Sequence, residues 1–121
     1  MNEHWIITDR TKPWTANAER RWHYQKRAAM VSDARQRFFY LAKQAKVPTL
    51  TACTITAVPC SKNRRSLADV AACYPTVKAA IDGIVDAGVI PDDDPEHLQA
   101  VTFLPTEIAG FDGLRIHILA L

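Results

Sequence analysis

The apolar positions along the chain follow two periodicities. Alternation with period two and a high content of β-branched residues predict a strand over residues 50–58. Apolar residues at three- and four-residue spacing favour helices, and the first of the two helical segments has no internal proline or glycine. The predicted elements, in order, are a strand at 5–8, a helical region at 18–46, a strand at 50–58, a helix at 75–87, and strands at 100–104 and 114–119. The order β–α–β–α–β–β predicts the α+β class: one domain with a mixed sheet and two or three helices packed on it.

Punctuating residues bound these elements. Pro48 ends the first helical region, Gly88 is a natural stop for the second helix, and Ser32 with Asp33 indicates a possible new start inside the first. The connection at 105–113 predicts a hairpin with a long loop between the last two strands. The residues expected to face the core are Phe38, Leu41, Ala42 and Ala45 in the first helical region, and Val77, Ile81, Ile84 and Val85 in the second.

Composition narrows the class of protein. The hydrophobic fraction of 48% is that of an ordinary globular domain, and no apolar run reaches membrane length. The N-terminus has no signal-peptide pattern, and the spacing of Cys53, Cys60 and Cys73 matches neither a zinc site nor a redox pair. These features predict a cytoplasmic protein with reduced thiols and no membrane partner.

Charge is divided unevenly between the two halves of the chain. Residues 1–65 hold 13 Lys/Arg against four Asp/Glu, a balance of +9. Residues 66–121 hold two Lys/Arg against nine Asp/Glu, a balance of −7. The basic half favours an anionic partner, and the acidic half favours a metal ion. The alternative is that both halves carry only solvated surface charge, as in a small interaction protein with no nucleic-acid role.

The most concentrated acidic feature is Pro91-Asp92-Asp93-Asp94-Pro95, which predicts a turn after the second helix. Neighbouring carboxylates repel one another unless a cation or basic groups offset their charge. Oxygen-only clusters suit Mg²⁺ or Mn²⁺, the ions that act on phosphate esters. On the triplet alone, a solvated acidic turn is the commoner outcome.

Taken in order, several segments resemble the RusA-like family of Holliday junction resolvases, in particular its short phage-borne members. They are the loop 12–17, the basic pair Arg64-Arg65, the helical segment 78–83 with its lysine and aspartate, the segment 87–90 with its glycine stop, and the paired aspartates Asp92-Asp93. The family's D-x-D-N before the helical lysine is missing. Asp69 is the carboxylate that fits a variant spacing there, ending at Pro75.

This resemblance implies a Mg²⁺-dependent endodeoxyribonuclease that cleaves branched DNA, acts as a homodimer, and works in the host cytoplasm if phage-encoded. It implies catalytic roles for Asp69, Lys78 and Asp93, and metal binding, with Mn²⁺ as an alternative ion, by Asp69, Asp92 and Asp93. The residues expected to contact DNA are Lys12, Asn17, Arg20, Arg21, Lys62, Arg64 and Arg65.

Each role has a structural alternative. Asp69 could cap a helix, and Lys78 could form an i,i+4 pair with Asp82. Trp14 and Trp22 could stack on bases or belong to the core. His97 follows the acidic run, and His117 alternates with isoleucines on a strand, which predicts an outward-facing side chain. At the level of function, the alternative is a DNA-binding protein of the same fold that has lost metal-dependent cleavage with the D-x-D-N motif.

Overall fold

The computed structural model describes residues 3–121, apart from the side chain of Ser66. Within this range the strands are β1 (His4–Asp9), β2 (Cys53–Ser61), β3 (Leu98–Phe103), β4 (Glu107–Ile108) and β5 (Gly113–Ala120). The helices are α1 (Ala16–Glu19), α2 (Tyr24–Gln44) and α3 (Tyr74–Asp86), with a 3₁₀-helix η1 at Arg64–Ser66.

The five strands form one mixed sheet with the order β1-β5-β2-β3, and β4 pairs with the end of β2. Strand β5 is antiparallel to both β1 and β2, whereas β2 and β3 are parallel. The β2-to-β3 connection runs through α3, as a parallel pair requires. The predicted α+β class is therefore confirmed.

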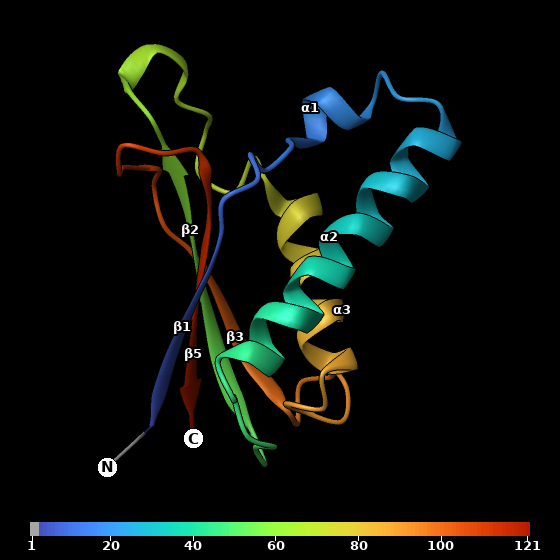
Figure 1. Cartoon of the computed structure of the whole chain (residues 1–121), viewed down its shortest axis with the longest axis vertical. Helices are drawn as coiled ribbons and strands as arrows, with labels where there is room; N and C mark the ends of the chain where they lie inside the picture. The colour runs from blue at the N-terminus through green and yellow to red at the C-terminus, as the bar shows by residue number, and fades with distance from the viewer. Residues whose placement is uncertain (1–2) are drawn as a thin grey trace.

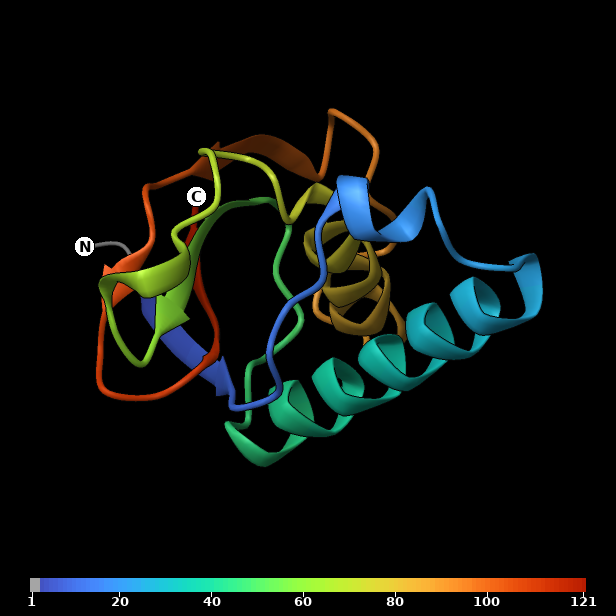
Figure 2. The same cartoon turned by 90° about the horizontal axis from the view of Figure 1, so that it is seen from above.

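Both long helices lie on one face of the sheet (Figure 1). The core between the layers comes from alternate residues of β2 and β5 and from the apolar stripe of α3, among them Ile55, Ile116, Ile118, Val77 and Ile84. Seen from above, α2 runs obliquely alongside α3 (Figure 2). The other face of the sheet has no helix over it within the described range.

The two long helices meet at close range around Gly83. A Cβ atom built there would lie 2.2 Å from the Arg35 carbonyl oxygen, so only glycine allows this approach of the two backbones. At the edge of this contact, Arg35 of α2 holds both carboxylate oxygens of Asp86 at 2.5 and 2.8 Å. Helix α3 is thereby set firmly against α2.

Three expectations about the first helical region were wrong. The helical region is broken after α1: Thr15 caps the start of α1, and His23 caps a separate start of α2. No new helix begins at Ser32 and Asp33, which lie inside the continuous α2. Ala45 follows the last turn of α2 and is exposed, although Phe38 and Ala42 are buried as expected.

The predicted hairpin of the last two strands does not form. Strand β2 separates β3 from β5 in the sheet and pairs with both of them. The helical crossover through α3 places β3 in parallel beside β2, and β5 then fills the remaining side of β2. Among the described helices, none combines the length and the apolar character needed to cross a membrane.

Candidate functional site

The centre of the candidate site is a lysine held by two carboxylates. The Nζ atom of Lys78, in the second turn of α3, donates to Asp82 Oδ1 at 3.0 Å one turn later. It also donates to Asp93 Oδ2, which the loop after α3 brings back along the helix. The expected i,i+4 pair is thus present, and it is joined by the aspartate that the sequence placed 15 residues away.

Lys78 and Asp93 each stabilise the charged form of the other. The hydrogen bond from Lys78 is the main reason that the pKa of Asp93 lies below its usual range. The hydrogen bond to Asp93 is the main cause of the raised pKa of Lys78; burial opposes it and Asp82 adds to it. Lys78 therefore stays cationic and Asp93 anionic across the neutral range.

The carboxylates of this cluster supply oxygen donors, but over residues 3–121 Asp82, Asp92 and Asp93 do not form a group whose ligand atoms all lie within 4.8 Å of one another. Asp82 and Asp93 both face one ammonium group, which places their oxygens within about 6 Å of each other at ordinary lengths of charged hydrogen bonds. Asp92 adjoins them, and its Oδ1 accepts from the main-chain N–H of Asp93 at 2.8 Å. Carboxylate oxygens are the ligands that Mg²⁺ and Mn²⁺ prefer.

Asp69 lies in a different place. It precedes α3, is exposed, and lines a cavity that neither Asp92 nor Asp93 reaches. Cys73 is the N-cap residue of α3 and makes no side-chain capping bond, so Asp69 does not cap this helix. Asp69 contributes to the local turn only through its carbonyl oxygen, which accepts from Ala72 N at 2.9 Å.

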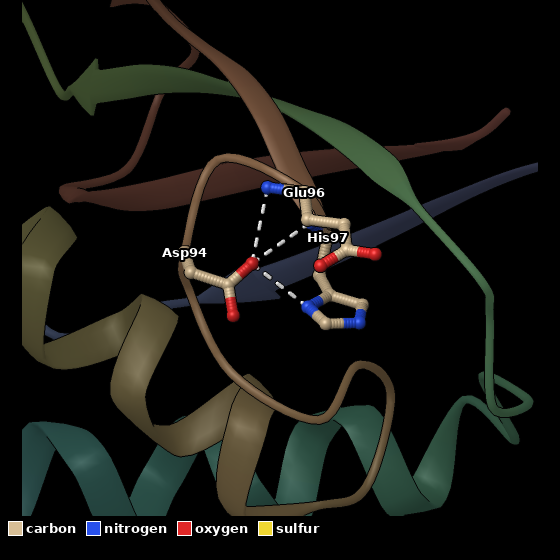
Figure 3. Close-up of side chains that lie close together, drawn as sticks. All are labelled: Asp94, Glu96 and His97. Atoms are coloured by element: carbon tan, nitrogen blue, oxygen red, sulfur yellow. Dashed lines mark hydrogen bonds and ion pairs between the residues drawn. The ribbon is translucent and has the colours of Figure 1, made fainter.

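The three predicted metal ligands Asp69, Asp92 and Asp93 do not converge. Over residues 3–121, the group of three potential ligands with atoms within 4.8 Å of one another is Asp94, Glu96 and His97. Figure 3 shows why these three meet: Asp94 Oδ1 accepts from the main-chain N–H of Glu96 and of His97, and lies 2.8 Å from His97 Nδ1. Hydrogen bonds that stabilise the turn account for this cluster, and His97 contacts Asp94 in it.

The cavity beside Asp69 has a volume of about 600 Å³. Figure 1 shows that α1 and the loop after β2, whose neighbouring segments line the cavity, lie at the same end of the molecule. Its walls come from the segment before α1, the end of β2 and the chain leading to α3. The polar residues lining it are Lys12, Thr15, Ser61, Lys62, Asn63, Asp69, Thr106 and Asp112. Asp112 accepts from the main-chain N–H of Lys62 at 3.0 Å, which ties the β4–β5 loop to the end of β2.

Basic residues around this end are free of carboxylate partners. In the described part of the chain, ion pairs engage Arg27, Arg35, Arg37, Lys78 and Arg115. None involves the basic residues expected to contact DNA, which are Lys12, Arg20, Arg21, Lys62, Arg64 and Arg65. Asn17 is exposed and accepts from Arg20 at 3.3 Å. These cations are available to an anionic partner.

Trp14 belongs to the core and is not a stacking platform. Only 5% of its surface is exposed, and its indole N–H donates to Glu19 at 2.9 Å. Its main-chain N–H and carbonyl both bond the hydroxyl of Thr76 at 2.9 Å, which anchors the loop before α1 to the first turn of α3. Trp22 packs beside it, with a distance of 5.9 Å between ring centroids.

Sequence reasoning missed two parts of this arrangement. Asp82 was considered only as a helix-surface partner of Lys78, whereas it shares the lysine with Asp93. Asp112 lines the cavity from a loop that carried no motif. The helical spacing could have suggested the first, because the residues at i and i+4 of α3 lie on one face. No family model matches the chain, and no curated protein matches it.

Proposed function

We propose that this protein is a Mg²⁺-dependent endodeoxyribonuclease that cleaves branched DNA such as four-way junctions. The observation that carries the proposal is the convergence of Lys78, Asp82 and Asp93. A lysine between two carboxylates beside a further aspartate provides both oxygen ligands and a positive charge for a phosphate group. The resemblance of the sequence to the RusA-like family supports the same chemistry.

In this proposal each residue has a defined task. Asp93 and Asp82 would hold the divalent ion, with Asp92 as a further ligand, once Lys78 leaves the space between them; the ion would supply charge neutralisation and a more acidic water. Lys78 then turns toward the scissile phosphate and stabilises the negative charge that develops there. Its raised pKa keeps it protonated for this role.

The unpaired cations position the DNA. Phosphate contacts by Lys12, Lys62, Arg64 and Arg65 hold the backbone beside the cavity, and Arg20 and Arg21 extend the same surface across α1. Two copies of the chain would bring two sites to opposing strands of a junction, because a four-way junction has approximate two-fold symmetry. We propose a homodimer for this reason.

Cleavage of a synthetic four-way junction tests the proposal. The wild-type protein should cut in Mg²⁺ and remain inactive in EDTA, and Asp93→Asn should lose cleavage while binding the junction as well or more tightly. Asp86→Asn is the matched control, because it also removes an exposed ion pair of α3 but lies with Arg35, outside the cluster. Full activity of Asp93→Asn would refute the site.

The second candidate is a DNA-binding protein without cleavage. It is favoured by one observation: Asp69 lines the cavity instead of joining Asp93. This candidate expects salt-sensitive binding to junction DNA, with no cut in either Mg²⁺ or Mn²⁺. The same assay therefore separates the two functions.

A further inference from the structure

A pair of histidines lies on the sheet face opposite the helices. His4 of β1 and His117 of β5 are diagonal neighbours in the antiparallel ladder, because His4 is opposite Leu119 and His117 is opposite Ile6. Their side chains therefore project from the same face. The outward direction predicted for His117 is confirmed, and His4 Nε2 lies 3.0 Å from His117 Nδ1.

The two rings are nearly parallel, with an interplanar angle of 18° and centroids 5.1 Å apart. They form one side of a groove of about 270 Å³, whose other walls are Thr54, Thr56, Leu104 and Leu119. No carboxylate lines this groove within the described residues, so the pair has no anionic partner there. The 3.0 Å contact is that of an N–H···N hydrogen bond between two rings, in which one nitrogen carries the hydrogen and the other accepts it. A metal ion that binds both nitrogens would displace that hydrogen.

The separation of the nitrogens suits a metal ion. Metal–nitrogen bonds of about 2.0–2.1 Å place two cis ligands about 2.9 Å apart in square geometry and about 3.4 Å apart in tetrahedral geometry. The 3.0 Å found here lies between these values. Imidazole donors select Cu²⁺, Ni²⁺ and Zn²⁺, whereas Mg²⁺ prefers oxygen.

We propose that His4 and His117 bind a divalent transition-metal ion, at a site separate from the Lys78–Asp93 cluster. The ion would join the edge strand β1, at its first residue, to the interior strand β5. Thr54 and Thr56 of β2 complete the polar lining, and the remaining coordination positions open toward solvent.

The electrostatic surroundings of His117 favour its neutral form. Burial lowers the pKa of His117, and the nearby His4 and Arg115 act in the same direction, while Glu107 opposes them. The ring is therefore neutral at pH 7, the form in which imidazole binds metal. Arg115 is itself paired with Glu107 from β4, which limits its repulsion of an ion.

Calorimetric titration with CuCl₂, NiCl₂ or ZnCl₂ in a non-chelating buffer tests the site. All four histidines of the chain should be replaced singly: His4→Gln and His117→Gln should each weaken binding at least about tenfold, since even supporting residues of metal sites contribute about 10–100-fold. His23→Gln and His97→Gln are matched controls and should leave the affinity unchanged, and excess MgCl₂ should not compete.

Electron paramagnetic resonance of the Cu²⁺ form should show coupling to two imidazole nitrogens in the wild-type protein and to fewer in either site variant. Binding lost in His4→Gln but kept in His117→Gln would assign the ion to His4 without His117, and would overturn the proposal. Equal binding by all four variants would overturn it as well. Neither readout depends on DNA cleavage, so the outcome is independent of the nuclease proposal.

Discussion

The contact between α2 and α3 around Gly83 leads to a sharp prediction about stability. In Gly83→Ala, the new methyl group would lie 2.2 Å from the carbonyl oxygen of Arg35 and 3.0 Å from the main-chain nitrogen of Phe39. Both are backbone atoms of α2, so no rotation of a flexible side chain can relieve the contact. The helices must separate by about 1 Å to restore an ordinary van der Waals distance.

Two opposing effects determine the size of the change. Alanine stabilises a helix by up to about 1 kcal/mol relative to glycine. Overpacking of a tight contact costs about 1–3 kcal/mol, and separation of the helices also loosens the buried packing of Phe38 and Ile84. We therefore expect Gly83→Ala to lower the free energy of unfolding by about 1–3 kcal/mol, because the atoms of α2 that the methyl group meets are backbone atoms, which cannot move aside alone.

Urea denaturation followed by circular dichroism measures this change. Gly88→Ala is the matched control: Gly88 has a φ of +84° and no atom within 4 Å of the added methyl group, so its cost of about 1–2 kcal/mol comes from backbone strain alone. Only Gly83→Ala should also disturb the Arg35–Asp86 pair and the position of Lys78 on α3. A Gly83→Ala protein more stable than the wild type would refute the close contact.

Three further predictions concern the site and its support. Replacing Arg64 and Arg65 with Ala should flatten the salt dependence of junction binding by roughly 0.9 in log–log slope per lost phosphate contact, measured by mobility shift; an unchanged slope would leave these arginines as surface charge only. Asp69→Ala should retain Mg²⁺-dependent cleavage and change stability by less than about 0.5 kcal/mol, because Asp69 lies apart from Asp93 and caps no helix; loss of cleavage by a folded variant would place Asp69 in the site after all. Thr76→Val should cost about 1–3 kcal/mol in urea denaturation, because the buried main-chain N–H and carbonyl of Trp14 lose their shared partner, whereas exposed Thr102→Val should not.

Much of the secondary structure follows from local pattern. The predicted helix at 75–87 differs from α3 by one residue at each end, and the predicted strand at 50–58 overlaps β2. Both succeed because apolar periodicity reports directly which face of an element is buried. The buried stripe of α3, with Val77, Ile81 and Ile84, is the one that the spacing indicates.

The break between α1 and α2 could not be predicted from the same information, because the intervening residues include neither proline nor glycine. Tertiary contacts hold α1 apart: Ala16 N donates to Ala72 O at 3.0 Å, and the Trp14 backbone bonds Thr76. Such contacts join residues more than 50 positions apart, which no local propensity encodes.

For the candidate site, too, the residue types could be predicted and the contacts between them could not. The residue types and their order indicated a lysine, paired aspartates and a basic surface, because charge and oxygen donors are properties of the side chains themselves. The course of the loop after α3 decides that Asp93 meets Lys78 while Asp69 lines a separate cavity. Strand pairing likewise decides that His4 meets His117 across 113 residues. The chemistry that the side chains can perform follows from the residue types alone. Which side chains meet depends on the tertiary structure, because the pairing of distant segments depends on how the whole core packs.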